Sequence, residues 1–325
     1  MGEPRLLYLS KKEVAETGLT MPEVIEAVEQ AFREKGEGRT EMPPKPGVHS
    51  RPNSFIHAMP AYIAGSGAIG VKWVAGYPEN SKKGLPYISG LIVLNDPDTG
   101  LPLAVMDCVW ITAMRTGAAT AVAARYLARK ESKTLGVLGA GVQGFSNLEA
   151  LKVLFPIERV AAYDIDEGQF DRYRQRIHDR WPDVEVVAAS EPRQAVEDMD
   201  MVVTAGPIVR PPHATINAGW LSEGAFISMV DFDSFWSGEA LAELDKFTTD
   251  DIPQLEHYKT LGYFQSIPPV YADLGELVSG RKSGRQSDTE RTAACNLGLA
   301  IDDLATAPLV YKRAVERGLG TWLPL

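Results

Sequence analysis

The sequence predicts an α/β protein with two domains, one of them α+β and the other built on a parallel β-sheet. At 325 residues the chain is longer than one ordinary domain. Residues 55–105 hold several strand-like segments in succession without helices between them, which indicates an antiparallel sheet. From about residue 133 onward, short apolar strands alternate with helices, which is typical of a parallel sheet. We therefore expect residues 1–117 and 302–325 to form the first domain and residues 118–301 the second.

The first domain is predicted to open with a short strand at residues 6–9, followed by two helices. Both helix starts carry the spacing of a capping box, Ser10 with Glu13 and Thr20 with Glu23. Residues 40–53 are rich in proline and are expected to form an extended loop.

The strands of this domain alternate with turn sequences rich in glycine, proline and asparagine. They are expected at residues 54–63, 68–77 and 88–96. An alanine-rich helix is predicted from about residue 112 to residue 129. The last long helix, about residues 297–317, is expected to return to the first domain.

The second domain is predicted from a regular succession of elements. Its first two strands are each followed by a helix, and three more apolar strands come after them. The expected strands cover residues 133–139, 159–166, 184–189, 199–206 and 224–230, and the expected helices cover residues 142–155 and 169–181.

Composition excludes several classes of protein. A formal net charge of −10 argues against nucleic acid or an anionic membrane as the main partner, because both bind basic surfaces. The sequence contains no apolar stretch long enough to span a membrane and no secretory signal. Two cysteines, Cys108 and Cys295, indicate a reducing compartment rather than a disulfide framework. We therefore expect a cytoplasmic protein.

The first strand of the second domain is followed by a glycine-rich turn, Gly139-Ala140-Gly141-Val142-Gln143-Gly144, which is G-x-G-x-x-G. The motif follows an apolar strand and opens a helix, as dinucleotide binding requires. Gly139 permits the tight turn, Gly141 lets the backbone approach a pyrophosphate, and Gly144 permits close helix packing. The free N–H groups of the helix start attract the phosphates. These features predict a Rossmann-type domain.

Acidic and small residues at strand ends refine the prediction of the cofactor. Asp164 ends the second strand, 25 residues after Gly139, near the position of the acid that binds a ribose diol. Asp166 is an alternative. Because a carboxylate repels a 2′-phosphate, NAD(H) is favoured over NADP(H). Thr204, Gly206 and Val230 lie at the ends of later strands, where the cofactor is expected to bind.

Three cations lie in apolar or proline-rich surroundings. Lys72 is inside the strand-like segment IGVKWVAG, Arg115 is inside ITAMRTGAATA, and Lys45 is in the proline-rich loop. A buried cation is costly without an anion, and a substrate carboxylate would satisfy all three. The alternative for each is a structural ion pair, or a side chain whose charged end reaches water.

Three further residues are candidates for acid–base or binding roles. Asp233 follows the strand that ends at Val230, where a carboxylate can bind an ammonium group or act as a general base. Asp231 is an alternative to Asp233. His57 is either an acid or base that contacts substrate, or a structural histidine of the core.

At these residues the sequence resembles the ornithine cyclodeaminase/mu-crystallin family over nearly its whole length. The resemblance is carried by MPAYIAGSGAIGVKWVAGYPEN, by the Thr-Ala-Met-Arg-Thr-Gly-Ala run around Arg115, by LGVLGAGVQG, and by NLGLAIDDLATAPLVYKRA near the end. The family implies an N-terminal substrate-binding and dimerisation domain, a Rossmann domain with NAD(P), and a homodimer.

The resemblance also implies roles for individual residues. Lys72 and Arg115 fall on positions that hold the substrate carboxylate, and Lys45 falls where the family often has arginine. Asp233 falls on the catalytic aspartate, so we take Asp233 and Lys72 as the catalytic pair. The cofactor set comprises Arg115, Gly139, Gly141, Val142, Gln143, Gly144, Asp164, Thr204, Gly206, Val230 and Asn296.

Two departures from the family pattern bear on the substrate. His57 stands where ornithine cyclodeaminases have glutamate. Residues 231–237 read Asp-Phe-Asp-Ser-Phe-Trp-Ser where the family has a Gly-Gly-Asp-x-Pro-Gly-Lys type of segment. The family lysine is absent and aromatic residues are present, which weakens the case for ornithine as substrate.

The sequence therefore favours an NAD(H)-dependent amino-acid dehydrogenase or imine reductase that acts on a small 2-amino, 2-imino or 2-oxo acid. One alternative is an ornithine or lysine cyclodeaminase that uses NAD catalytically, without net redox change. The other is a crystallin-like protein that binds a nucleotide without turnover.

Overall fold

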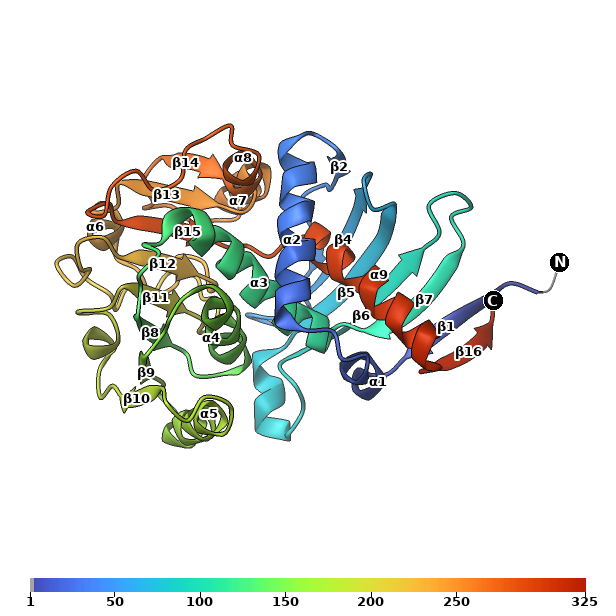
Figure 1. Ribbon diagram of the computed structural model, residues 1–325, viewed down its shortest axis with the longest axis horizontal. Coiled ribbons are helices and arrows are strands. Elements are labelled where there is room, and N and C mark those ends of the chain that lie inside the picture. Colours follow the sequence, from blue (N-terminus) through green and yellow to red (C-terminus); the bar gives the residue numbers. More distant parts are fainter. Residues whose placement is uncertain (1–2) are drawn as a thin grey trace. The chain divides into compact units, whose positions relative to one another are not determined.

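The computed structural model describes residues 3–325, and their contacts divide the chain into two units (Figure 1). Unit 1 comprises the residues up to Arg115 together with Leu299–Leu325, and unit 2 comprises Thr116–Gly298. The boundary between them falls within the helix α3 (Val109–Leu127). Each unit contains one eight-stranded sheet, and the predicted fold class is confirmed.

The sheet of unit 1 has the strand order β16-β1-β7-β6-β5-β4-β2, with β3 paired to β4. The pairs from β4 to β7 are antiparallel, as predicted, whereas β1 lies parallel to β7. The strands are β1 (Arg5–Leu9), β2 (Thr40–Glu41), β3 (Gly47–Val48), β4 (Phe55–Ile63), β5 (Ala68–Gly76), β6 (Ile88–Asn95), β7 (Pro102–Asp107) and β16 (Thr321–Pro324).

The two faces of this sheet differ because side chains alternate along each strand. The helix α9 (Ala300–Arg317) packs on β4, β5 and β6, and α2 (Met21–Gly36) packs on α9. Side chains on that face, such as Met59 and Ile92, are buried. Trp73 and Leu91, which are paired in register, are 49% and 41% exposed on the opposite face. Figure 1 shows α9 lying across the strands.

Several boundaries in unit 1 differ from the prediction. Both predicted capping boxes form, at the starts of α1 (Lys11–Glu16) and α2. The proline-rich loop contains the short strands β2 and β3, which are too brief to show an alternating pattern. A 3₁₀ turn occupies Pro78–Lys83. The last helix begins at Ala300 rather than near residue 297, because the preceding glycine, Gly298, has a φ of +77°.

The sheet of unit 2 has the order β10-β9-β8-β11-β12-β15-β13-β14, and all its pairs are parallel. Its first five strands therefore have the 3-2-1-4-5 order of the Rossmann fold. The strands are β8 (Thr134–Leu138), β9 (Arg159–Tyr163), β10 (Glu185–Ala188), β11 (Met201–Thr204), β12 (Phe226–Met229), β13 (Lys246–Thr249), β14 (Val270–Asp273) and β15 (Thr292–Cys295).

The helices of unit 2 cover this sheet. The predicted helices after β8 and β9 are present, whereas three short helices and the strands β13 to β15 were not predicted, because they are too short to show a period. The helices are α4 (Val142–Leu154), α5 (Glu167–Arg180), α6 (Gly238–Leu241), α7 (Ile252–Thr260) and α8 (Leu274–Val278), with a 3₁₀ turn at Pro192–Ala195.

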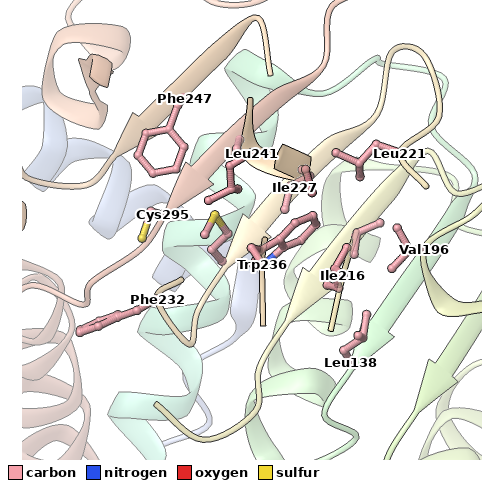
Figure 2. Packing of buried hydrophobic residues seen from close by; sticks show 14 of the residues in the cluster. Leu138, Val196, Ile216, Leu221, Ile227, Phe232, Trp236, Leu241, Phe247 and Cys295 are labelled. Carbon is pink, nitrogen blue, oxygen red and sulfur yellow. The ribbon is translucent and has the colours of Figure 1, made fainter. Parts of the chain in front are cut away.

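A cluster of buried hydrophobic residues forms a core in unit 2. Figure 2 shows Trp236 within this core, which also contains Phe232 and Phe247. Trp236 and Phe232 come from the loop after β12, so the loop that carries Asp233 is anchored in the core on both sides. No described helix is both long and apolar enough to cross a membrane.

Candidate active site

The glycine-rich turn forms the geometry that its sequence predicts. Gly139 has a φ of +98°, and a Cβ there would lie 2.6 Å from the carbonyl oxygen of Ala205. A Cβ on Gly144 would lie 2.3 Å from the carbonyl oxygen of Gly139. Gly141 is different, because a Cβ there would meet no described protein atom within 4 Å. The space at Gly141 is thus open to a ligand, while Gly139 and Gly144 serve the packing of the turn.

The helix α4 presents its first N–H groups beside this open space. Gly141 is its N-cap and has no side chain to accept hydrogen bonds from those groups. Val142, the first residue of the helix, is 58% exposed. Uncapped N–H groups and the helix dipole favour a phosphate at this position.

Asp164 lies at the end of β9 and is joined to the glycine-rich turn. Its Oδ2 accepts a hydrogen bond of 2.8 Å from the N–H of Ala140, and its Oδ1 accepts one of 3.0 Å from the N–H of Asp166. Gln169 donates to the carbonyl of Ala140 at 2.9 Å. Asp166 is the N-cap of α5 and accepts from the N–H of Gly168. Of the two acids, Asp164 is the one hydrogen-bonded to the glycine-rich turn itself.

Asp231 holds the end of β11. It accepts hydrogen bonds from the hydroxyl of Thr204 at 2.6 Å and from the N–H of Gly206 at 2.8 Å. Burial, with a smaller contribution from the nearby Asp233, raises the pKa of Asp231 to about 7 against these two hydrogen bonds. Thr204 is fully buried, and its hydroxyl is taken up by Asp231, so it supports the end of β11 rather than facing a ligand.

Asp233 is the more available of the two aspartates after β12. It is 4% exposed, and burial raises the pKa of its carboxyl group. Its Oδ2 accepts a hydrogen bond of 2.9 Å from the N–H of Phe264. Its buried Oδ1 has no hydrogen-bond partner among the described residues. A buried carboxyl group with a raised pKa and one oxygen without a described partner is suited to accept or return a proton.

A cavity of about 240 Å³ lies within unit 2 beside Asp233. Its walls combine apolar side chains with a few polar ones, as is typical of small-molecule pockets. They include Asp233, Trp236, Pro212, Ala214, Gln265 and Ser266.

Asn296 follows β15 and is tied to two hydroxyl groups. Its amide nitrogen lies 3.2 Å from the hydroxyl oxygen of Thr120 and 3.3 Å from that of Ser228, and those two hydroxyls are 2.7 Å apart. Its buried carbonyl oxygen, Oδ1, has no partner among the described residues. A buried acceptor without a partner suits a ligand that donates a hydrogen bond, such as a carboxamide.

In unit 1, Lys72 and Arg115 meet two aspartates that the sequence analysis did not identify. Lys72 Nζ lies 2.5 Å from Asp303 Oδ2, and Arg115 Nε lies 3.2 Å from Asp303 Oδ1. Arg115 Nη1 lies 3.5 Å from Asp302 Oδ2. All four side chains are buried. Burial lowers the pKa of Lys72, Arg115 acts in the same direction, and Asp303 opposes them.

These contacts show that the structural ion pair, left open as an alternative for Lys72 and Arg115, exists for both. Asp302 and Asp303 begin the returning helix α9 within the apolar sequence Ala-Ile-Asp-Asp-Leu-Ala. Two adjacent acids in an apolar segment indicate buried charges, but the segment does not show which cations they meet.

His57 lies on β4, close to other basic groups of unit 1. Its ring stacks on Phe55 with a centroid distance of 4.3 Å. Burial lowers the pKa of His57 to about 3, and the charges of Lys45, His49 and Lys72 lower it in the same direction. Lys45, which is half-buried, and Lys72 are thus both near this ring. His57 is a neutral imidazole at physiological pH and offers no charge partner to a cationic side chain.

The fold and these residues define a class: a protein with a Rossmann-type dinucleotide-binding unit and a second unit that holds buried cations. The chain belongs to the ornithine cyclodeaminase/mu-crystallin family, whose model matches residues 7–318.

Its relatives include enzymes of known activity. The chain is 37% identical to an alanine dehydrogenase from Archaeoglobus fulgidus, over 97% of each chain. It resembles the structure of Thermococcus litoralis Δ1-pyrroline-2-carboxylate reductase in complex with NADH and L-proline. That match has a TM-score of 0.88 and 36% identity, over 97% of this chain and 99% of the other. It also resembles an archaeal alanine dehydrogenase dimer with bound NAD, with a TM-score of 0.87 and 35% identity, over 98% and 99%.

The lowered pKa of His57 predicts a pH dependence of stability. Between pH 6.5 and about 3 the unfolded chain protonates this histidine and the folded protein does not. The free energy of unfolding therefore falls as pH falls through this window, by up to about 1.4 kcal/mol per pH unit. We expect His57→Gln to reduce this slope, measured by urea unfolding at pH 6.5, 5.5 and 4.5.

His178→Gln, on an exposed position of α5, is the matched control and should keep the wild-type slope. Equal slopes for the wild type and His57→Gln would contradict a buried neutral imidazole.

Proposed function

We propose that the chain is an NAD(H)-dependent oxidoreductase that interconverts a small 2-amino acid with the corresponding 2-imino or 2-oxo acid. The observation that carries the proposal is Asp233, a buried carboxyl group with one free oxygen at the carboxyl end of the unit 2 sheet. The alanine dehydrogenase and the pyrroline-carboxylate reductase that the chain resembles both act on a C–N bond next to a carboxylate.

Residues of unit 2 fit a dinucleotide cofactor. The open space at Gly141 and the uncapped start of α4 suit the pyrophosphate, with Val142 and Gln143 beside it. Asp164 suits the adenosine ribose. The free Oδ1 of Asn296 suits the carboxamide, with Gly206 and Val230 at neighbouring strand ends. When bound, NAD(H) supplies or accepts the hydride.

Unit 1 would hold the substrate carboxylate. Lys72 and Arg115 are held by Asp302 and Asp303, so their cationic groups are oriented before the substrate arrives. Lys45 would add a third positive charge. We also propose that Arg115 takes part in binding the cofactor and that His57 takes part in binding the substrate.

Asp233 and Lys72 would be the acid–base groups of the reaction. In the oxidative direction Asp233 accepts a proton from the substrate ammonium, which frees the nitrogen lone pair. In the reductive direction it returns that proton to the nitrogen. Burial raises the pKa of Asp233 and lowers that of Lys72, so both groups exchange protons more readily near neutral pH than they would in water.

We also propose a homodimer formed through the open face of the unit 1 sheet. Trp73, Leu91 and Tyr8 are 49%, 41% and 40% exposed there, on strands whose other face is covered. An apolar sheet face of this kind typically binds a partner. The archaeal alanine dehydrogenase that the chain resembles is a dimer, so a second copy is the occupant we propose.

The activity is tested by absorbance at 340 nm with NADH or NADPH, a panel of 2-oxo acids with ammonium or methylamine, and cyclic imino acids. NAD with L-amino acids tests the reverse direction. We expect turnover with NADH, and Asp233→Asn should lower kcat by about 10²–10⁴-fold, because it removes the proton acceptor. Asp171→Asn, an exposed change on α5, should leave kcat unchanged.

Wild-type activity in Asp233→Asn would overturn the role of this residue. Ammonia release from ornithine or lysine without a net change at 340 nm would instead identify a cyclodeaminase.

The glycine-rich turn offers a test of cofactor binding. We expect Gly141→Ala to leave the melting temperature unchanged but to weaken NADH binding at least about tenfold, because its Cβ enters the space for the pyrophosphate. Gly144→Ala should lower stability by about 1–3 kcal/mol, since its Cβ overlaps the Gly139 carbonyl. Thermal unfolding and NADH fluorescence titration measure the two effects. Full NADH affinity in folded Gly141→Ala would contradict the assignment.

The dimer is tested by light scattering after size exclusion. Trp73→Asp places a charge on the open sheet face and should shift the protein from dimer to monomer. Val153→Asp, which changes an exposed apolar residue on α4, is the matched control and should stay dimeric. A wild-type protein that elutes as a monomer, or a dimeric Trp73→Asp variant, would refute this interface.

A further inference from the structure

Two phenylalanines of unit 2 have a left-handed backbone. Phe232 has a φ of 63° and Phe264 has a φ of 56°. Only two other described non-glycine residues have positive φ, Asn53 and Asp198, and asparagine and aspartate adopt this region comparatively easily. For a bulky side chain the conformation is strained, and it persists only where the surroundings enforce it.

The enforcing surroundings are aromatic. The rings of Phe232 and Phe264 pack on each other with a centroid distance of 5.1 Å. Phe232 also packs edge-on against Tyr258 at 4.8 Å and Tyr263 at 5.5 Å. Phe232 is 3% exposed and Phe264 is 2% exposed. Each ring is therefore held by burial and by aromatic contacts, which offset the backbone strain.

Both strained residues adjoin Asp233. Phe232 separates Asp231 from Asp233 in the chain, and its left-handed turn lets the two carboxyl groups serve different partners. Asp231 binds the end of β11, whereas Asp233 binds the N–H of Phe264. That hydrogen bond occupies Oδ2 and leaves Oδ1 as the one oxygen without a described partner.

We propose that Phe232 and Phe264 are positioning residues, which together fix the Asp233 carboxyl group so that only Oδ1 is offered to a substrate amine. Phe232 sets the direction of the chain at Asp233, and Phe264 supplies the N–H that fixes the rotation of the carboxyl group. The contact between the two tilted rings joins these two functions, so that neither backbone turn can relax alone. The inference rests on the proposed function of Asp233 and adds to it the residues that orient it.

The proposal predicts that, of the glycine and leucine variants at Phe232, the one with the lower melting temperature has the higher kcat. Phe232→Gly removes the whole ring, but glycine adopts positive φ without strain. Phe232→Leu keeps more of the packing, but leucine is strained at positive φ, and the ring contacts that enforce this conformation are gone. If Phe232 had only a structural role, the glycine variant would have both the lower melting temperature and the lower kcat, because its cavity is larger.

We expect Phe232→Leu to lower kcat by about 10–100-fold with KM changed by less than about threefold, because the misdirected carboxyl group no longer meets the amine. We expect Phe232→Gly to keep kcat within about fivefold of wild type, although its melting temperature is the lower of the two. Phe264→Leu and Phe264→Gly should repeat the same order. They provide a second test if the variants at Phe232 do not fold.

Phe247→Leu is the control for loss of a buried ring from the same core. Phe247 lies on β13, apart from Phe232 in Figure 2, and its change should lower the melting temperature with kcat kept within about twofold. NADH binding should remain at wild-type strength in every folded variant.

Activity that follows stability, with the leucine variants more active than the glycine variants at both positions, would overturn the proposal. Asp233→Asn separates this outcome from failure of the proposed function. If Asp233→Asn is inactive while the phenylalanine variants follow stability, the positioning role alone is wrong. If Asp233→Asn keeps full activity, the function assigned to Asp233 is wrong.

Discussion

Unit 1 depends on one buried group of charges, formed by Lys72 and Arg115 with Asp302 and Asp303. Leaving one of these charges buried without its partner would cost several kcal/mol, whereas a sheet and helix joined by apolar contacts alone would tolerate displacement. The group joins β5 and the start of α3 to the start of α9, three segments far apart in the sequence. It explains why the last helix packs on a sheet made by the first hundred residues.

Unit 2 depends on a different constraint: segments of its backbone must approach one another closely. Glycines at 139 and 144 let β8, α4 and the end of β11 meet without side chains between them, and Gly141 leaves the resulting turn open. Asp164 and Asp231 then bind backbone N–H groups at neighbouring strand ends. The same carboxylates that complete the fold thus line the edge of the sheet where ligands of such folds bind.

Those features of the fold and of the candidate site that depend on local sequence patterns could be predicted from the sequence. The glycine motif predicted the tight turn, and the alternation of strands and helices predicted the parallel sheet. Cations in apolar segments predicted buried charges, but not which anions they meet. Asp302 and Asp303 were missed because their partners lie nearly 200 residues or more away. The left-handed turn at Phe232 was missed because phenylalanine predicts the opposite backbone conformation, and only tertiary packing with Phe264 enforces it. The strands β13 to β15 were too short to show a period.

The discontinuity of unit 1 has a consequence for synthesis of the protein. Unit 2 is one continuous segment, Thr116–Gly298, so all of its contacts can form once that segment has left the ribosome. Unit 1 cannot be completed until its second segment, Leu299–Leu325, has emerged. Until then Lys72 and Arg115 have no aspartates to neutralise them, and the apolar face of the sheet has no helix α9. The nascent chain therefore carries an incomplete first unit and a complete second one until Leu299–Leu325 have emerged.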